Sequence, residues 1–223
     1  MLVNEFVAGS LAILLDLPVP KFEFIDVQQD FIDVFSPDLP FPVTAGIHFG
    51  SQEVKKALAI TNGKMLDELS NSEIVPMLLL FDHWIHNADR DKNKGNLLLN
   101  LSTKELIVID HTHVFEIGPL WDAVQLHHRI AETSIAPLDL EGFVYHRLIR
   151  FVKGNDPFAP ALDSFNSLVK ESVASIVGEI PEEWGCTEQE KHILLEYLMN
   201  RHSLIPSVPQ LLRSQLPYWK GGV

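Results

Sequence analysis

Apolar and polar positions repeat with helical spacing in some parts of the chain and with strand spacing in others. Residues 2–15 are rich in Leu, Ala and Phe and end before two prolines, which predicts a helix. Apolar and acidic side chains alternate in residues 22–27, as is typical of a strand. The most apolar segment, 74–85, predicts a helix that is buried on most sides. Residues 97–99 and 106–109 are apolar runs separated by a short polar turn, and they predict a β-hairpin.

The remaining segments carry weaker patterns. Three prolines predict a connector over residues 28–42, and flanking glycines predict a turn over 46–51. Short helices are expected at 52–61 and 64–70. Beyond residue 119 the expected helices cover residues 161–177, 187–200 and 208–215, the second of which begins with a Thr-x-x-Glu capping box. This order of elements predicts an α+β protein that is mainly α, with a large helical lobe and a small β-hairpin at its mouth.

Composition and charge narrow the class of protein. The chain has 223 residues, 46% of them hydrophobic and 21% charged, which is typical of a globular protein. The formal net charge of −13 argues against nucleic-acid or acidic-membrane binding, because both need a basic surface. A single cysteine, Cys186, excludes a disulfide within the chain and fits a reducing compartment. No apolar run approaches the ~20 residues that span a bilayer, so a cytoplasmic location is expected.

The candidate chemistry lies in the polar loop 86–96, between the apolar helix and the hairpin. The strands of a hairpin are antiparallel, so Asn96, entering the first strand, should lie beside Asp110, leaving the second. Asp89 lies in the loop just before them. Metal-assisted phosphoryl transfer needs at least one catalytic carboxylate and, apart from it, side chains that hold a hard cation, for which an Asn and an Asp are suited. Asp110 also follows an apolar strand and needs a partner, for which Mg²⁺ would serve.

The same residues have plainer structural interpretations. Asp89 could be a solvated or Asx-turn residue, Asn96 a turn residue, and Asp110 a cap for the turn that follows. Arg90 and the two lysines that follow it make the loop locally basic. These cations could attract phosphate or could simply form a solvated face.

A histidine-rich metallohydrolase is a further alternative. Its ligands would come from a set rich in imidazole, which suits zinc, iron or manganese. The sequence has neither an HExxH motif nor a G-x-S-x-G motif. The candidate ligands are His83, His86, Asp89, Asp110 and His111.

The loop and hairpin, with the run Ile109-Asp110-His111, resemble the catalytic loop and metal-binding Asp of HipA-like kinases. These are distant relatives of the protein-kinase and phosphatidylinositol-4-kinase folds. Residues 4–20 and 44–51 are similar to the family's first helix, its following turn and a later glycine-containing segment. The resemblance covers residues 2–115, about half of the chain.

This resemblance implies roles for individual residues. Asp89 would be the catalytic carboxylate that faces the substrate hydroxyl. Asn96 and Asp110 would hold Mg²⁺ on the phosphates of ATP. Glu5 would be the helix carboxylate that pairs with an ATP-binding lysine, and residues 22–31 would approximate the hinge against which adenine lies.

The resemblance also implies a division of the chain and reveals two departures from the family. Residues 1–43 would be the remnant of the N-terminal lobe and hinge, and residues 44–223 the helical catalytic lobe. The Asn falls seven positions after Asp89 rather than five, so Asn93 could replace Asn96 as the ligand. No lysine precedes the helix carboxylate and no G-x-G-x-x-G motif is present. The N-terminal lobe is therefore expected to be truncated. Three explanations are open: an incomplete gene product, a lobe supplied by another polypeptide, or a degenerate kinase that binds without catalysing.

The function expected from these features is an ATP- and Mg²⁺-dependent kinase of the HipA type that phosphorylates a Ser/Thr hydroxyl, with a protein as the substrate class. The alternatives are a non-catalytic, pseudokinase-like binding module and the metallohydrolase. Many HipA-like proteins are toxins of toxin–antitoxin pairs. The resemblance therefore implies an antitoxin, or a polypeptide that supplies the missing lobe, as a partner.

Overall fold

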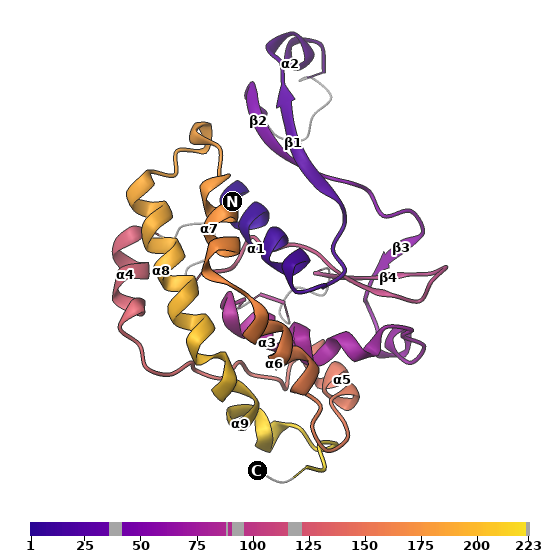
Figure 1. The fold of residues 1–223 in the computed structure, drawn as a ribbon. Coiled ribbons are helices and arrows are strands. Elements are labelled where there is room, and N and C mark those ends of the chain that lie inside the picture. Colours follow the sequence, from indigo (N-terminus) through magenta and orange to yellow (C-terminus); the bar gives the residue numbers. More distant parts are fainter. Residues whose placement is uncertain (36–41, 88, 91–95, 116–121, 222–223) are drawn as a thin grey trace.

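Helices predominate over strands in the computed structural model, which describes residues 1–35, 42–87, 89–90, 96–115 and 122–221. The long α8 lies beside α4 along one side of the body, and α1 lies between α7 and the strands (Figure 1). The α-helices are α1 (Leu2–Leu14), α2 (Gln29–Phe35), α3 (Val75–Trp84), α4 (Ala123–Ile130), α5 (Tyr145–Leu148), α6 (Ala159–Ser167), α7 (Lys170–Gly178), α8 (Glu188–Leu204) and α9 (Val208–Leu212).

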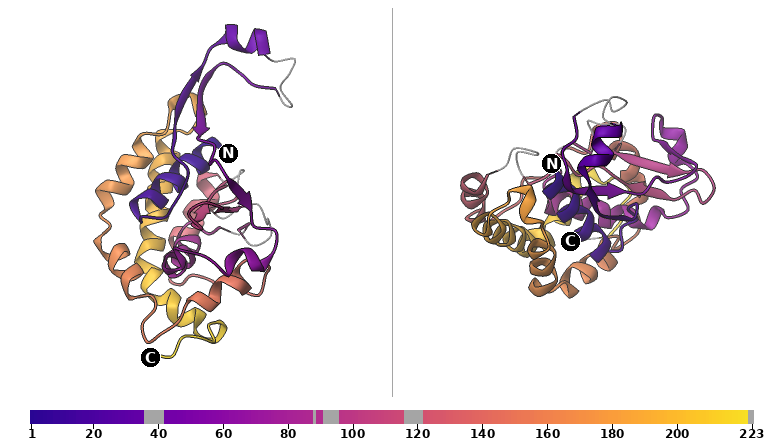
Figure 2. Two further views of the ribbon diagram at one scale, coloured as in Figure 1. Left: turned by 90° about the vertical axis from the view of Figure 1, so that its right-hand side faces the viewer. Right: turned by 90° about the horizontal axis from the view of Figure 1, so that it is seen from above.

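Two small antiparallel sheets complete the fold. Strands β1 (Phe22–Val27) and β2 (Gly46–Ser51) pair along their full lengths. With α2 at its end, this pair extends away from the helical body as an arm (Figure 2). The second sheet has the order β3-β4-β5, and its strands are β3 (Ala57–Ala59), β4 (Leu97–Asn100) and β5 (Leu106–Val108).

The core is organised around α3, in which all ten residues are buried. A helix with apolar side chains on every face must be covered on every side, and α6, α8 and α9 all contact it. The indole of Trp84 donates a hydrogen bond of 2.8 Å to the carbonyl of Leu198 in α8. The capping box predicted for α8 is present: Thr187 and Glu190 bond to each other's backbone N–H groups. This central helix runs directly into the candidate loop, so the loop begins from a fixed position.

The strongest patterns were interpreted correctly. The first helix, the strand 22–27, the buried helix and the hairpin all appear within two residues of their predicted bounds. The prediction of an α+β, mainly α protein is confirmed. The division at residue 43 stays a prediction, and the pairing of β1 with β2 joins residues on either side of it.

The connector predicted over 28–42 is wrong at residues 29–35, and the turn predicted over 46–51 is wrong as well; residues 36–41 lie outside the described residues. Residues 29–35 form α2, because the prolines begin only after this helix ends. Phe31 and Phe35, four residues apart, stack with ring centroids 4.6 Å apart. Residues 46–51 form a strand because β1 supplies backbone partners along their whole length, and this pairing overrides the turn preference of the flanking glycines.

Three predicted helices are also corrected. The segment 52–61 contains β3 instead, which is held in the sheet by β4. Within 64–70 only a single 3₁₀ turn forms, Gly63–Leu66, with the side chain of Asn62 capping it. The predicted helix 161–177 is broken in two because Leu168 is extended, with ψ 121°. In the last segment, α9 ends at Leu212 and a 3₁₀ turn follows.

In the part of the chain that the structure describes, we find no helix with both the length and the apolar character needed to cross a bilayer.

Candidate active site

The loop after α3 is shaped by its own polar side chains. The side-chain oxygen of Asn87 accepts hydrogen bonds of 3.1 Å from the backbone N–H groups of both Asp89 and Arg90. This Asx-type turn fixes the backbone that carries the Asp89 carboxylate. The amide of Asn96 then donates to Asp89 Oδ2 at 3.2 Å. The first two predicted site residues are therefore in direct contact.

Arg90 holds the two ends of the hairpin together. Its side chain is fully buried and forms an ion pair with Asp82 of α3 at 3.0 Å. Its Nη1 also donates hydrogen bonds of 2.8 Å to the backbone carbonyls of Asn96 and Ile109. The hydroxyl of Tyr145 completes the cluster by donating to Asp82 at 2.8 Å. Both interpretations of Arg90 from sequence, phosphate attraction and a solvated face, are wrong, because its guanidinium is buried against α3 and the hairpin.

The same contacts bring Asp110 to the mouth of the hairpin. Asn96 pairs with Ile109 through a backbone hydrogen bond of 3.3 Å, so Asp110 lies one residue beyond the position facing Asn96. Asp110 has φ 55°, a left-handed conformation that few residues other than glycine adopt. Its carboxylate accepts the N–H of Thr112 at 3.2 Å. His86, at the other end of the loop, also has a left-handed backbone, with φ 51°.

Glu5 of α1 binds the turn that follows Asp110. Its carboxylate accepts the backbone N–H of His111 at 3.0 and 3.1 Å and the hydroxyl of Thr112 at 2.7 Å. Burial alone would raise the pKa of Glu5, but the hydrogen bonds from His111 and Thr112 outweigh it and hold that pKa below its ordinary value. Asn4 adds a bond of 2.8 Å to the carbonyl of Thr112. Helix α1 thus holds the turn that follows Asp110. Pairing of the Glu5 carboxylate with a lysine stays a prediction.

A cavity of about 300 Å³ opens beside this turn. Phe22 and Phe49 form part of its apolar wall, and Glu5, Asp110 and Thr112 line its polar end. Gly9 also lines it, and a Cβ there would come within 3.0 Å of the Phe22 ring, so glycine allows α1 to lie this close to β1. An apolar wall with a few polar groups at one end is the usual form of a small-molecule site.

The donor atoms suit a hard cation. The Asn96 amide is oriented with its nitrogen toward Asp89, which leaves Oδ1 as its acceptor atom. Asp110 contributes carboxylate oxygens. Oxygen ligands of this kind are those that Mg²⁺ takes from proteins. Asn93, the alternative ligand, lies outside the described residues, as do Lys92 and Lys94.

The imidazole-rich metal site is not formed. Both ring nitrogens of His83 are already used: Nδ1 lies 2.7 Å from the Leu79 carbonyl, and Nε2 accepts the N–H of Leu138 at 3.0 Å. Among the residues with described positions, no three His, Cys, Asp or Glu side chains are arranged to hold a metal ion. The predicted ligand set of the metallohydrolase, in which His83 was paired with His86, is therefore wrong.

The buried ring of His83 leads to a prediction about stability. Burial lowers the pKa of His83 from 6.5 to about 4. Between these values the unfolded chain binds a proton that the native protein does not, so the free energy of unfolding should fall as the pH falls from 6.5 to 4. The expected loss is about 3 kcal/mol. Urea unfolding at pH 7.5, 6.0 and 4.5 measures it. His83→Gln removes this group, so the free energy of unfolding of the variant should fall by about 3 kcal/mol less over the same pH range. An equal fall in the two proteins would contradict the assignment.

A polar loop, the mouth of a hairpin and a helix carboxylate thus meet beside one cavity. The family model of HipA-like kinases matches residues 1–133, which include every residue of the predicted site. The chain belongs to the HipA-like kinase family. No curated protein matches it.

A solved structure supports the same fold across nearly the whole chain. The crystal structure of a Helicobacter pylori proinflammatory kinase, CtkA, matches with a TM-score of 0.57 and 15% sequence identity. The match covers 96% of this chain and 86% of that chain. At this identity the comparison shows the fold. The helices beyond residue 133 are therefore part of the kinase-like architecture.

Proposed function

We propose that this protein binds ATP with Mg²⁺ and transfers the γ-phosphoryl group to a Ser/Thr hydroxyl of a protein substrate. The observation that carries the proposal is the Arg90-centred arrangement. Arg90 binds the carbonyls of Asn96 and Ile109, while Asn96 donates to Asp89. A carboxylate and two candidate metal ligands are thereby gathered at one hairpin mouth.

Each residue has a distinct proposed role. Asp89 accepts or orients the proton of the attacking hydroxyl, the usual part of a kinase loop carboxylate. Asn96 and Asp110 hold the cation that, when bound, neutralises charge on the phosphates. Glu5 fixes the turn from which Asp110 projects. The cavity between α1 and β1 receives the nucleotide, and Phe22 lies beside the adenine ring of the bound ATP.

Replacing Asp110 by alanine tests the metal role. Loss of one carboxylate ligand should weaken Mg²⁺-dependent ATP binding by at least about tenfold, since such ligands supply much of the attraction for the ion. Calorimetry with ATP, in Mg²⁺ and in EDTA, measures it. Asp163→Ala, which removes an exposed carboxylate from α6, is the matched control and should bind like the wild type. Equal ATP affinity in Asp110→Ala and the wild type would show that Asp110 is not a ligand.

One observation favours a second candidate, a pseudokinase-like module that binds without transfer. The Glu5 carboxylate is engaged by His111 and Thr112, and among the described residues no lysine forms an ion pair with it. Without such a lysine the transferring phosphate loses electrostatic stabilisation, a loss that commonly slows transfer by orders of magnitude. This candidate predicts ATP binding with no labelled protein after incubation with γ-labelled ATP. An antitoxin, or a polypeptide that supplies an N-terminal lobe, remains a proposed partner for either function.

A further inference from the structure

The arm formed by β1, β2 and α2 carries much of the exposed apolar surface of this protein. Fourteen large apolar side chains are exposed in the described parts of the chain, and five of them lie in residues 24–35. Within α2 only Ile32 is buried. Clusters of exposed apolar side chains usually mark an interaction surface. The five side chains are Phe24, Ile25, Phe31, Val34 and Phe35.

Three of these side chains form a stripe on α2. Phe31, Val34 and Phe35 occupy positions i, i+3 and i+4, so they lie near one another on the helix surface. The rings of Phe31 and Phe35 stack on each other. Helices with this spacing of apolar side chains commonly bind a partner by inserting the stripe into an apolar groove. The α2 stripe therefore has the anchors of a groove-binding helix.

The charge around the α2 stripe is negative. Asp30 and Asp33 both lie in α2 and both are exposed. Asp33 accepts a hydrogen bond of 2.8 Å from the neutral amide of Gln29, and Asp30 accepts the backbone N–H of Phe31. In the part of the chain with described positions, no cationic side chain forms an ion pair with either aspartate. A surface that binds α2 should therefore be apolar at its centre and cationic at its rim.

A groove with an apolar centre lies beside β3 and β4 and has a volume of about 690 Å³. Leu58 of β3 and Leu101, which directly follows β4, are exposed, and Met65 and Leu99 also line this β3–β4 groove. The two exposed leucines and the five side chains of the arm make up half of the fourteen exposed apolar side chains. The arm and the groove are thus two apolar surfaces on one chain.

The rim of the β3–β4 groove carries cations. Lys64 and Lys104 line it together with one carboxylate, that of Glu68. Glu68 pairs with Lys104 at 3.2 Å, whereas Lys64 forms no ion pair among the described residues. The excess of cations is unusual in a chain with a formal charge of −13, and it complements the aspartates of α2.

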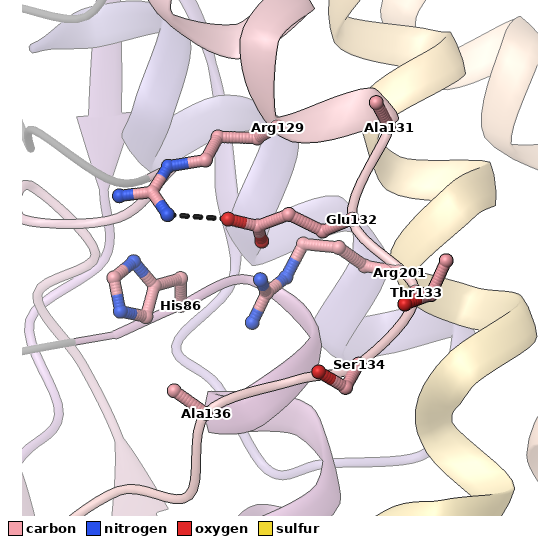
Figure 3. Close-up of a pocket in the computed structure, with 8 residues that line it drawn as sticks. All are labelled: His86, Arg129, Ala131, Glu132, Thr133, Ser134, Ala136 and Arg201. Atoms are coloured by element: carbon pink, nitrogen blue, oxygen red, sulfur yellow. Dashed lines mark hydrogen bonds and ion pairs between the residues drawn. The ribbon is translucent and has the colours of Figure 1, made fainter.

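The arginines around the cavity between α3, α4 and α8 are engaged within the molecule (Figure 3). Arg129 forms an ion pair with Glu132. Arg201 is buried, and its Nε donates a hydrogen bond of 2.8 Å to the carbonyl of Trp84. These guanidinium groups already have acceptors in their own chain. The β3–β4 groove, with its exposed leucines and a lysine outside any described ion pair, matches the α2 stripe better.

The two surfaces are separate within one molecule, because α2 lies at the far end of the arm, away from β3 and β4 (Figure 1). We propose that the protein self-associates, with the α2 stripe of one copy inserted into the β3–β4 groove of a second copy. The two aspartates of α2 then lie beside Lys64 and Lys104 of the groove. Each molecule has one arm and one groove, so the contact closes into a reciprocal dimer or continues into a chain. This inference does not depend on the proposed kinase function.

Sedimentation velocity of the purified protein, over about a hundredfold range of concentration, tests the association. The mean mass of the wild type should rise above that of the monomer as the concentration rises. Phe31→Ala and Leu58→Ser each remove an anchor from one of the two surfaces and should weaken association at least about tenfold. Val169→Ser, on neither surface, is the matched control, because Phe31, Leu58 and Val169 are all 52% exposed. It should associate like the wild type.

A charge exchange shows whether the arm of one copy meets the groove of another. The arm variant is Asp30→Lys/Asp33→Lys, and the groove variant is Lys64→Glu/Lys104→Glu. Alone, each places like charges together at every contact and should associate at least about tenfold more weakly than the wild type. In an equal mixture, both kinds of contact between the two variants join opposite charges. The mixture should therefore recover association to within about threefold of the wild type.

Three results would overturn the inference. The first is a wild-type protein that stays monomeric at every concentration, which would leave the arm and the groove to other partners. The second is association that Phe31→Ala and Leu58→Ser leave unchanged, or that Val169→Ser weakens to the same degree. The third is a mixture of the two charge variants that associates no better than either variant alone. Urea unfolding of every variant should match the wild type, since all the altered side chains lie at the surface.

Discussion

Arg90→Met should destabilise this protein by about 3–5 kcal/mol, the usual result of removing one member of a buried ion pair. The substitution keeps an unbranched side chain but leaves the Asp82 carboxylate in the core without its cation, where the Tyr145 hydroxyl still donates a hydrogen bond to it. The carbonyls of Asn96 and Ile109 lose their shared donor as well. Urea unfolding at pH 7 measures the loss, and hydrogen exchange should show faster opening of β4 and β5 than of α8.

A double-mutant cycle separates the pair from the other contacts of Arg90. Asp82→Asn in the Arg90→Met background removes the buried charge, so the double variant should recover part of the stability that the single variant loses. ATP binding should be weak in both Arg90→Met and the double variant, because the carbonyls of Asn96 and Ile109 lack their donor in each. A loss below about 1 kcal/mol in Arg90→Met, the level of an exposed pair, would contradict a structural role for Arg90.

The site was predictable from sequence where it depends on hairpin geometry. The turn between two apolar runs fixes which residues enter and leave the strands, so Asn96 and Asp110 could be expected at one mouth. Asp89 was expected only in the loop just before them, and hairpin pairing does not encode the hydrogen bond that it accepts from Asn96. Arg90 was misjudged because charged loop residues are usually solvated. One signal was available: Asp82 interrupts the apolar run 74–85, and a carboxylate there needs a cationic partner.

Local patterns failed where pairing between distant segments determines the conformation. Strand β2 has two glycines among its six residues, yet β1 supplies its hydrogen-bond partners. Strand β3 has only three residues and depends on β4 in the same way. The contact of Glu5 with His111 joins positions 106 residues apart, and no periodicity within either segment encodes it. Such contacts arise where α1 meets the turn that follows β5, an arrangement that only the assembled fold defines.

Asp89→Asn should slow phosphoryl transfer by a factor of about 10² to 10⁴, the usual contribution of a general base. The amide is close to the carboxylate in shape, and its oxygen can still accept the hydrogen bond from Asn96, so the loop should keep its conformation. MgATP affinity should therefore stay close to that of the wild type, because Asp89 is not a proposed cation ligand. Incorporation of γ-labelled phosphate into protein gives the rate, and calorimetry gives the affinity.

His113→Gln provides the matched control for this variant. The His113 ring lies 3.6 Å from Asp89 Oδ2 but is half exposed and has no proposed part in the chemistry. Its loss should change the rate by less than about threefold, since exposed pairs contribute little. A general base acts only in the reaction, whereas a loop-shaping carboxylate also affects binding. If Asp89→Asn transferred phosphate as fast as the wild type, or lost rate and MgATP affinity to the same degree, Asp89 would be a structural residue of the loop and the base would have to be sought elsewhere.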